Sequence, residues 1–102
     1  MKLRTYIVED NATIRENLIG TLEELAEVEA VGIAETEDEG KEWLTSHTSQ
    51  WDLAIVDLFL RQGSGLGVLA ACRNRLSAQK MVVLSNYATP DVRMRCAQLG
   101  VD

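Results

Sequence analysis

Hydrophobic and polar residues alternate in blocks along the chain, and the pattern repeats four times. Short apolar runs containing β-branched residues lie at residues 3–8, 30–34, 53–56 and 80–84. Runs of this length, bounded by polar residues, predict β-strands. The third run (LAIV) is unbroken and is closed by Asp57, which is typical of a central parallel strand covered on both faces.

Each apolar run is followed by a segment with helical spacing. From Thr13 to near Glu27, leucine and isoleucine recur at intervals of three and four residues, and Thr13 with Glu16 fits a capping box. A second helix is expected over residues 38–46. A third is expected over the stretch that contains Leu66, Leu69, Ala70 and Leu76.

Proline and glycine mark the limits of a fourth helix. Pro90 suits its first turn, and Gly100 suits its C-terminal end. A strand–helix order repeated four times predicts an α/β fold with a parallel sheet and helices on both faces.

Length and charge limit the functions open to this chain. Its 102 residues predict a single domain, and the formal net charge of −6 argues against nucleic acid as a direct partner. Residues 1–57 carry four basic and fourteen acidic side chains, whereas residues 58–102 carry six and two. The acidic half could host a cation, although solvated glutamates on helix surfaces explain much of this asymmetry.

The cysteines, the histidine and the hydropathy pattern favour a reduced, cytoplasmic protein. Cys72 and Cys96 lie apart, without a CxxC pair, and fit buried small hydrophobes. His47, the single histidine, lies in a polar segment and is expected at the surface. We expect no signal peptide before the charged start of the chain, and no apolar run is long enough to cross a membrane.

Polar residues directly follow three of the four predicted strands. Glu9 and Asp10 follow the first, Asp57 closes the third, and Ser85 follows the fourth. Ligands of open parallel sheets bind beyond the carboxyl ends of the strands, so these side chains should converge there if the strands are neighbours. Carboxylates placed so close together repel one another unless a cation or proton neutralises them. A hard divalent ion such as Mg²⁺ would do so.

Each of these residues also has a purely structural interpretation. Asp10 or Asn11 could cap the first helix, Asp57 could belong to a turn, and the Ser85 hydroxyl could bond to loop backbone. Three such coincidences at three strand ends are less probable than any one of them. Three glycines after Asp57 fit neither a P-loop nor a dinucleotide fingerprint and are expected to form a flexible loop: Gly63, Gly65 and Gly67.

Taken together, these segments resemble the receiver domain of bacterial two-component response regulators. The resemblance rests on YIVEDN after the first strand, LAIVDLFL around Asp57, Gly65 eight positions later, VVLSNY, and the Pro-initiated helix ending in LGVD. It implies a flavodoxin-like doubly wound sheet of strand order 2-1-3-4.

The resemblance also implies a role for each site residue. Asp57 would accept a phosphoryl group from a sensor histidine kinase. Glu9, Asp10 and Asp57, with the backbone carbonyl of Phe59, would hold Mg²⁺, and Ser85 would sense the phosphoryl group. The domain would then be a phosphoacceptor switch that acts only on its own phosphorylation state and not a turnover enzyme.

The chain departs from the family pattern in three places. Residues 1–102 would form a receiver domain truncated at its C-terminal end, without the fifth strand and helix of the family. Arg61 stands where the family usually has proline. Asn86 stands where a smaller residue is usual, which could restrict access to Asp57.

Two other functions remain open from the sequence. A phosphorylation-independent receiver-like interaction domain would more often have lost one of the acidic or hydroxyl residues. An aspartate-based phosphatase of the haloacid dehalogenase type would have a second aspartate where this chain has Phe59. Without a fifth strand, residues 80–84 would form a sheet edge, which predicts a homodimer or an exchange of elements through that edge.

Overall fold

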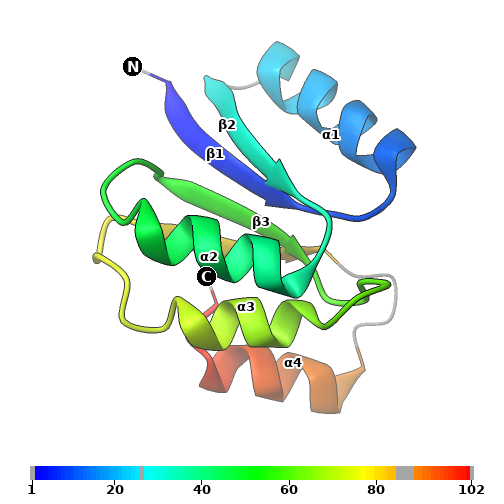
Figure 1. The fold of residues 1–102 in the computed structure, drawn as a ribbon, viewed down its shortest axis with the longest axis vertical. Coiled ribbons are helices and arrows are strands. Elements are labelled where there is room, and N and C mark those ends of the chain that lie inside the picture. The colour runs from blue at the N-terminus through cyan, green and yellow to red at the C-terminus, as the bar shows by residue number, and fades with distance from the viewer. Residues whose placement is uncertain (1, 26, 85–88, 102) are drawn as a thin grey trace.

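The chain folds into four strand–helix units, as the apolar pattern predicts (Figure 1). The computed structural model describes residues 2–25, 27–84 and 89–101. The strands are β1 (Leu3–Val8), β2 (Val28–Ala34), β3 (Leu53–Asp57) and β4 (Lys80–Leu84). The helices are α1 (Ala12–Leu25), α2 (Glu37–Ser46), α3 (Gly65–Ala71) and α4 (Pro90–Gln98). Within these residues, no helix is both long enough and apolar enough to cross a membrane.

All neighbouring strands pair in parallel, in the order β2-β1-β3-β4. This order confirms the flavodoxin-like doubly wound fold. The register places Val8 of β1 beside Val56 of β3, and Asp57 beside Leu84 of β4. The carboxyl ends of the three strands therefore lie level with one another at one edge of the sheet. In the described sheet β4 is an outer strand, and its Leu84 side chain is 40% exposed.

The strands bury side chains on both faces, because successive residues point to opposite sides. On one face Tyr6, Val8, Ala54 and Val56 join a cluster with side chains of α2, α3 and α4. On the other face Ile7 and Ile55 are buried. Figure 1 shows α1 apart from the other three helices. Cys72 and Cys96 are buried free thiols, as predicted.

The ends of α1 and α4 have local causes. The prediction that Thr13 and Glu16 form a capping box is wrong, because the side-chain oxygen of Asn11 accepts the Ile14 N–H at 3.0 Å and caps α1 two residues earlier. At the end of α4, Gly100 adopts a φ of 80°. The Val101 N–H donates to the Cys96 carbonyl at 3.1 Å, which closes a Schellman motif. Gly100 therefore lies at the C-terminal end of this helix, as the sequence predicts.

The third helix is shorter than the sequence predicts and begins earlier. It ends at Ala71. The buried Gln79 side chain holds the segment that follows: it accepts the Leu76 N–H and donates to the carbonyls of Thr48 and Trp51. The prediction of a flexible glycine loop is wrong for Gly65 and Gly67, which lie in the first turn of α3.

The single histidine lies against an aromatic pair and not simply in solvent. The rings of Tyr6 and Trp43 stack at 4.3 Å, and the Trp43 and His47 rings stack at 4.4 Å. His47 also ends α2, where its N–H donates to the Trp43 carbonyl. It is half-buried, and its Nδ1 lies 2.9 Å from both the Ser46 hydroxyl and the Trp43 carbonyl, so it packs against the end of its own helix.

Candidate functional site

Three carboxylates, which we call the acidic group, meet at the carboxyl edge of the sheet. Glu9 and Asp10 directly follow β1, and Asp57 is the last residue of β3. One carboxylate oxygen of each residue lies within 4.8 Å of the other two. Glu9 is buried, whereas Asp10 and Asp57 are partly exposed. The structure thus brings together the three acidic residues that the strand ends single out.

The repulsion among the three carboxylates affects the pKa of Glu9. Burial raises the pKa of its carboxyl above the ordinary value, and the nearby charges of Asp57 and Asp10 raise it further. The Asn11 N–H, which donates to Glu9 at 3.1 Å, acts in the opposite direction and lowers the pKa. Three oxygen-donor groups that repel one another are suited to a hard divalent cation, which would remove the repulsion.

The turn after β3 holds the Asp57 side chain. The Phe59 N–H donates to an oxygen of the Asp57 carboxylate at 3.2 Å, and Phe59 forms an antiparallel bridge with Ser64. The Asp57 carboxylate is therefore oriented by the loop that follows it. The Phe59 ring is 53% exposed, so this loop presents an apolar side chain beside the acidic group.

Arg61 in the same loop is bound to Asp10. Its backbone N–H donates to Asp10 at 2.7 Å, and its guanidinium Nε lies 3.8 Å from the same carboxylate oxygen. The two residues are 51 positions apart in sequence. The positively charged Arg61 side chain therefore lies close to the Asp10 carboxylate of the acidic group.

A second arginine, Arg15, lies beneath the site and was not singled out by the sequence. It is buried on α1, and its guanidinium donates to the backbone carbonyl of Glu9 at 2.9 Å. The same nitrogen lies 3.8 Å from a carboxylate oxygen of Glu35. Arg15 thus fixes the backbone that carries the acidic pair. Its helical spacing gave no sign of this, since an arginine in an amphipathic helix usually faces solvent.

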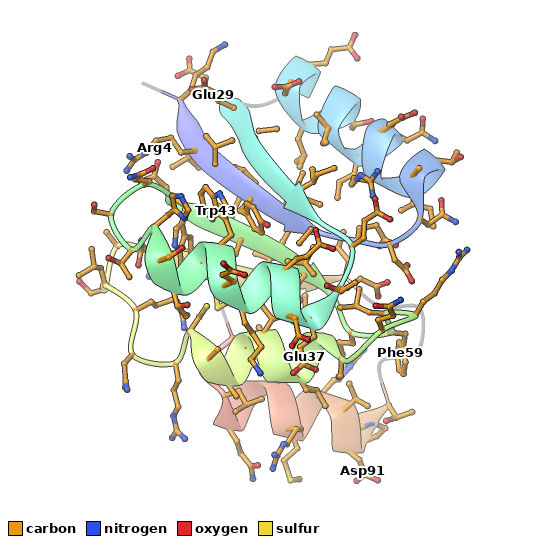
Figure 2. All side chains as sticks on the ribbon, in the orientation of Figure 1. Arg4, Glu29, Glu37, Trp43, Phe59 and Asp91 are labelled. Atoms are coloured by element: carbon orange, nitrogen blue, oxygen red, sulfur yellow. The ribbon has the colours of Figure 1, made fainter. Side chains whose placement is uncertain are left out.

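Glu37 is also a residue that the sequence did not single out. It lies in the first turn of α2, and Figure 2 shows it between α2 and α3. Its carboxylate accepts the Ser64 N–H at 2.8 Å and pairs with Lys41 at 3.1 Å. These hydrogen bonds, that from Ser64 first, hold the pKa of Glu37 below its ordinary value. Glu37 therefore anchors the far end of the loop that carries Phe59 and Arg61.

Glycines make room for that anchor. A Cβ on Gly67 would contact the Glu37 carboxylate, and a Cβ on Gly63, whose φ is 90°, would contact the Glu37 side chain. The spacing of the glycines after Asp57 is the one feature of the sequence that could have revealed the position of Glu37. This spacing reflects the close approach of another segment and not flexibility.

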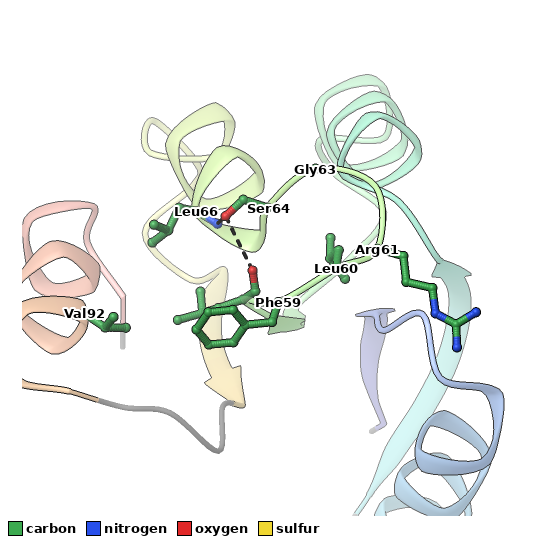
Figure 3. Close-up of a pocket in the computed structure, with 8 residues that line it drawn as sticks. Phe59, Leu60, Arg61, Gly63, Ser64, Leu66 and Val92 are labelled. Atoms are coloured by element: carbon green, nitrogen blue, oxygen red, sulfur yellow. Dashed lines mark hydrogen bonds between the residues drawn. The ribbon is translucent and has the colours of Figure 1, made fainter.

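An open pocket of about 330 Å³ lies beside the acidic group, between the β3–α3 loop and α4 (Figure 3). Apolar side chains of Leu58, Phe59, Leu66 and Val92 line it. Figure 3 shows the Arg61 side chain leaving the loop on the side away from Val92. The pocket is therefore mainly apolar, and the charges lie at the neighbouring acidic group.

Two of the predicted site roles are not tested by the structure. Ser85, like Asn86, lies outside the described residues. The Phe59 backbone carbonyl stays a predicted metal ligand, although its N–H is placed at Asp57.

An open parallel sheet of order 2-1-3-4, with acidic residues where β1 and β3 end, defines a flavodoxin-like protein whose ligand site lies at the carboxyl edge. The chain belongs to the response regulator receiver domain family, which matches residues 5–102.

Similar proteins agree with this membership. The acid tolerance regulatory protein ActR of Rhizobium meliloti (strain 1021) is 34% identical over 94 residues, which cover 92% of this chain. The match spans 46% of ActR, so the chain corresponds to about half the length of that relative.

Solved structures share the fold. A response regulator receiver protein from Pseudomonas putida is 26% identical, with a TM-score of 0.78 over 99% of this chain and 82% of that one. The chain matched in the CheX–CheY–BeF3⁻–Mg²⁺ complex from Borrelia burgdorferi is 14% identical, with a TM-score of 0.86 over 98% of this chain and 74% of that one. At that identity, the second match shows the fold alone.

Proposed function

We propose that this receiver domain takes a phosphoryl group from a sensor histidine kinase onto Asp57. The observation that carries the proposal is the meeting of Glu9, Asp10 and Asp57 within 4.8 Å at the carboxyl edge of the sheet. Membership of the receiver family supports it, because phosphoacceptance is what that family does.

The transfer follows the chemistry of a carboxylate nucleophile. A carboxylate oxygen of Asp57 attacks the phosphorus of a phosphohistidine in the kinase. The phosphorus–nitrogen bond breaks, and the imidazole leaves with the electron pair and takes up a proton. An acyl phosphate remains on Asp57. The Phe59 N–H, which donates to Asp57, orients the attacking carboxylate.

Mg²⁺ fits the donor set of this site. Asp10 and Asp57 would bind it directly, with the Phe59 carbonyl, and Glu9 would act through water. When bound, the ion offsets the negative charge of the transferring phosphoryl group. Glu9, whose pKa is raised by burial and by its acidic neighbours, would lose that repulsion.

Ser85 is the proposed sensor of the phosphoryl group. Its hydroxyl would donate to an oxygen that only the acyl phosphate supplies, and such a ligand-dependent bond is what a two-state switch requires. The domain would therefore act as a switch in the cytoplasm, with neither nucleic acid nor a membrane as a direct partner of this chain.

Mass spectrometry after incubation with acetyl phosphate and Mg²⁺ tests the phosphoacceptor. A single phosphoryl adduct is expected in the wild type and should be lost in Asp57→Asn. Asp38→Asn, an exposed aspartate in the first turn of α2, is the matched control and should keep the adduct. An adduct at full yield in Asp57→Asn would refute the assignment, and no adduct in any variant would favour the phosphorylation-independent interaction domain.

A Mg²⁺ titration followed by the backbone amide resonances of residues near Asp57 tests the metal site. Asp10→Ala should weaken Mg²⁺ binding, because it removes one of the proposed direct carboxylate ligands. An unchanged affinity in Asp10→Ala would contradict the proposed ligand set.

Self-association through β4 is a separate proposal. Met81 is buried, but Leu84 is substantially exposed on this outer strand, which has no neighbour on one side in the described sheet. Sedimentation of the 102-residue chain over a range of concentrations should show a dimer that Val82→Lys removes. A monomer at every concentration would refute the proposal.

A further inference from the structure

Arg61 is attached to the acidic group in two different ways. Its backbone N–H is fixed on an Asp10 oxygen at 2.7 Å, whereas its guanidinium lies 3.8 Å from that oxygen. The Arg61 side chain is 84% exposed, and the Asp10 side chain is only 13% exposed. The anchor is therefore the backbone, and the charged end is free to leave without disturbing the loop.

The contact between Arg61 and Asp10 affects cation binding because Asp10 belongs to the acidic group. Asp10 lies within 4.8 Å of the carboxylates of Glu9 and Asp57, so it is the member of the group that is already partly neutralised by a cation of the chain. A divalent ion that binds Asp10 directly binds the same carboxylate, one oxygen of which faces both Arg61 contacts. The guanidinium and the ion carry charge of the same sign, and they repel each other when both are close to Asp10.

The loop geometry keeps the Arg61 backbone at this site. The Ser64 N–H is held by Glu37, and the Phe59 N–H is held by Asp57. Arg61 lies between these two fixed points, and its own N–H makes a third. Its backbone is therefore held beside Asp10 even when the ion pair is broken, and the side chain starts from that point.

We infer that Arg61 is an internal counter-cation of Asp10, which Mg²⁺ must displace in order to bind. The inference rests on the proposed Mg²⁺ site and adds a residue that sets the affinity of that site. Arg61 offsets part of the negative charge of Asp10 in the metal-free protein and lowers the affinity of the site for the ion. The arginine is a positioning residue, and it takes no part in the bonds that form or break.

Mg²⁺ titrations of four proteins at low ionic strength test this inference, each followed by the backbone amide of Asp57. Arg61→Gln keeps the backbone N–H and removes the charge, and it should bind Mg²⁺ about two- to fivefold more tightly than the wild type, as expected for an exposed ion pair. Arg61→Lys keeps the positive charge, so its Mg²⁺ affinity should lie close to the weaker affinity of the wild type. Arg73→Gln removes the same charge from an exposed position beyond the end of α3, and it should match the wild type.

Two further readouts separate displacement from a general charge effect. The gain in Arg61→Gln should shrink as NaCl is raised, because exposed ion pairs are screened. In the wild type, the Arg61 Nε–H resonance should shift with Mg²⁺ and saturate together with the Asp57 amide. A purely structural role for Arg61 would move neither readout.

The outcomes distinguish this inference from the proposed function. Equal Mg²⁺ affinity in Arg61→Gln and wild type, with weaker binding in Asp10→Ala, would overturn the role of Arg61 and leave the metal site standing. Equal gains in Arg61→Gln and Arg73→Gln would overturn it as well, since charge at any position would then suffice. No Mg²⁺ binding by the wild type would refute the metal site itself, and this inference with it.

Discussion

Alanine in place of glycine should have opposite effects at two positions of this chain, and the structure gives the reason for each. Gly65 is buried at the start of α3, against the end of β3. A Cβ there would contact the Asp57 carbonyl oxygen and would lie 2.8 Å from the Leu58 Cα and 2.9 Å from the Asp57 carbonyl carbon. All three are backbone atoms, so the conflict cannot be relieved by a side-chain rotation.

The cost at Gly65 follows from this overpacking. Extra atoms in a well-packed region usually cost about 1–3 kcal/mol, and a forced backbone shift places Gly65→Ala near the upper end, at about 2–3 kcal/mol. A domain of this size has a total stability of about 5–15 kcal/mol, and each kilocalorie lowers Tm by about 4–8 °C. We therefore expect Tm to fall by about 10–20 °C.

Gly20 provides the matched control. It lies inside α1, and a Cβ there would have no heavy atom within 4 Å. Alanine at this position should stabilise the protein by about 0.5–1 kcal/mol, because glycine loses more conformational freedom in a helix. The two variants differ from the wild type by the same methyl group, so any difference between them comes from its surroundings.

Urea unfolding, followed by the fluorescence of Trp43 and the buried Trp51, measures both changes. Gly65→Ala should shift the midpoint down and Gly20→Ala should shift it up. A loss of less than about 0.5 kcal/mol in Gly65→Ala would refute the close approach of α3 to the Asp57 backbone. A destabilised Gly20→Ala would refute the open surroundings of Gly20.

Two further predictions concern titration and thiol chemistry. Hydrogen bonds from the Arg4 side chain and backbone N–H, at 3.1 and 2.8 Å, hold the pKa of Asp52 below its ordinary value, so this pair adds stability above about pH 4 and loses it as pH falls through the lowered pKa. The difference in unfolding free energy between wild type and Asp52→Asn should therefore shrink between pH 7 and pH 3, and a constant difference would contradict the pairing. Burial raises the pKa of Cys72 to about 11 and raises that of Cys96 as well, so neither thiol should react with a disulfide reagent at pH 8 until urea unfolds the protein. Rapid labelling of the folded chain would show that the thiols are accessible.

The sequence by itself determined the strand–helix order and the edge at which chemistry is concentrated. Apolar runs closed by acidic residues located β1 and β3 to within one residue, because a strand buried on both faces needs a continuous run of apolar side chains. Parallel strands end at the same edge of a sheet, so Asp10 and Asp57 were expected at one edge. Their convergence also needed β1 and β3 to be neighbours, which the family resemblance implied, and the register that makes the two strand ends level came from the structure.

Only the tertiary structure decided which residues support that edge. Arg15, Glu37 and Arg61 act through partners 6, 27 and 51 positions away. Such contacts depend on how loops and helices pack over the sheet. Local patterns cannot distinguish a buried arginine or an anchoring glutamate from the same residues on a solvated helix. The glycines after Asp57 illustrate the limit: their spacing was visible in the sequence, but its cause is the close approach of Glu37 and of the Asp57 backbone, which exists only in the folded chain.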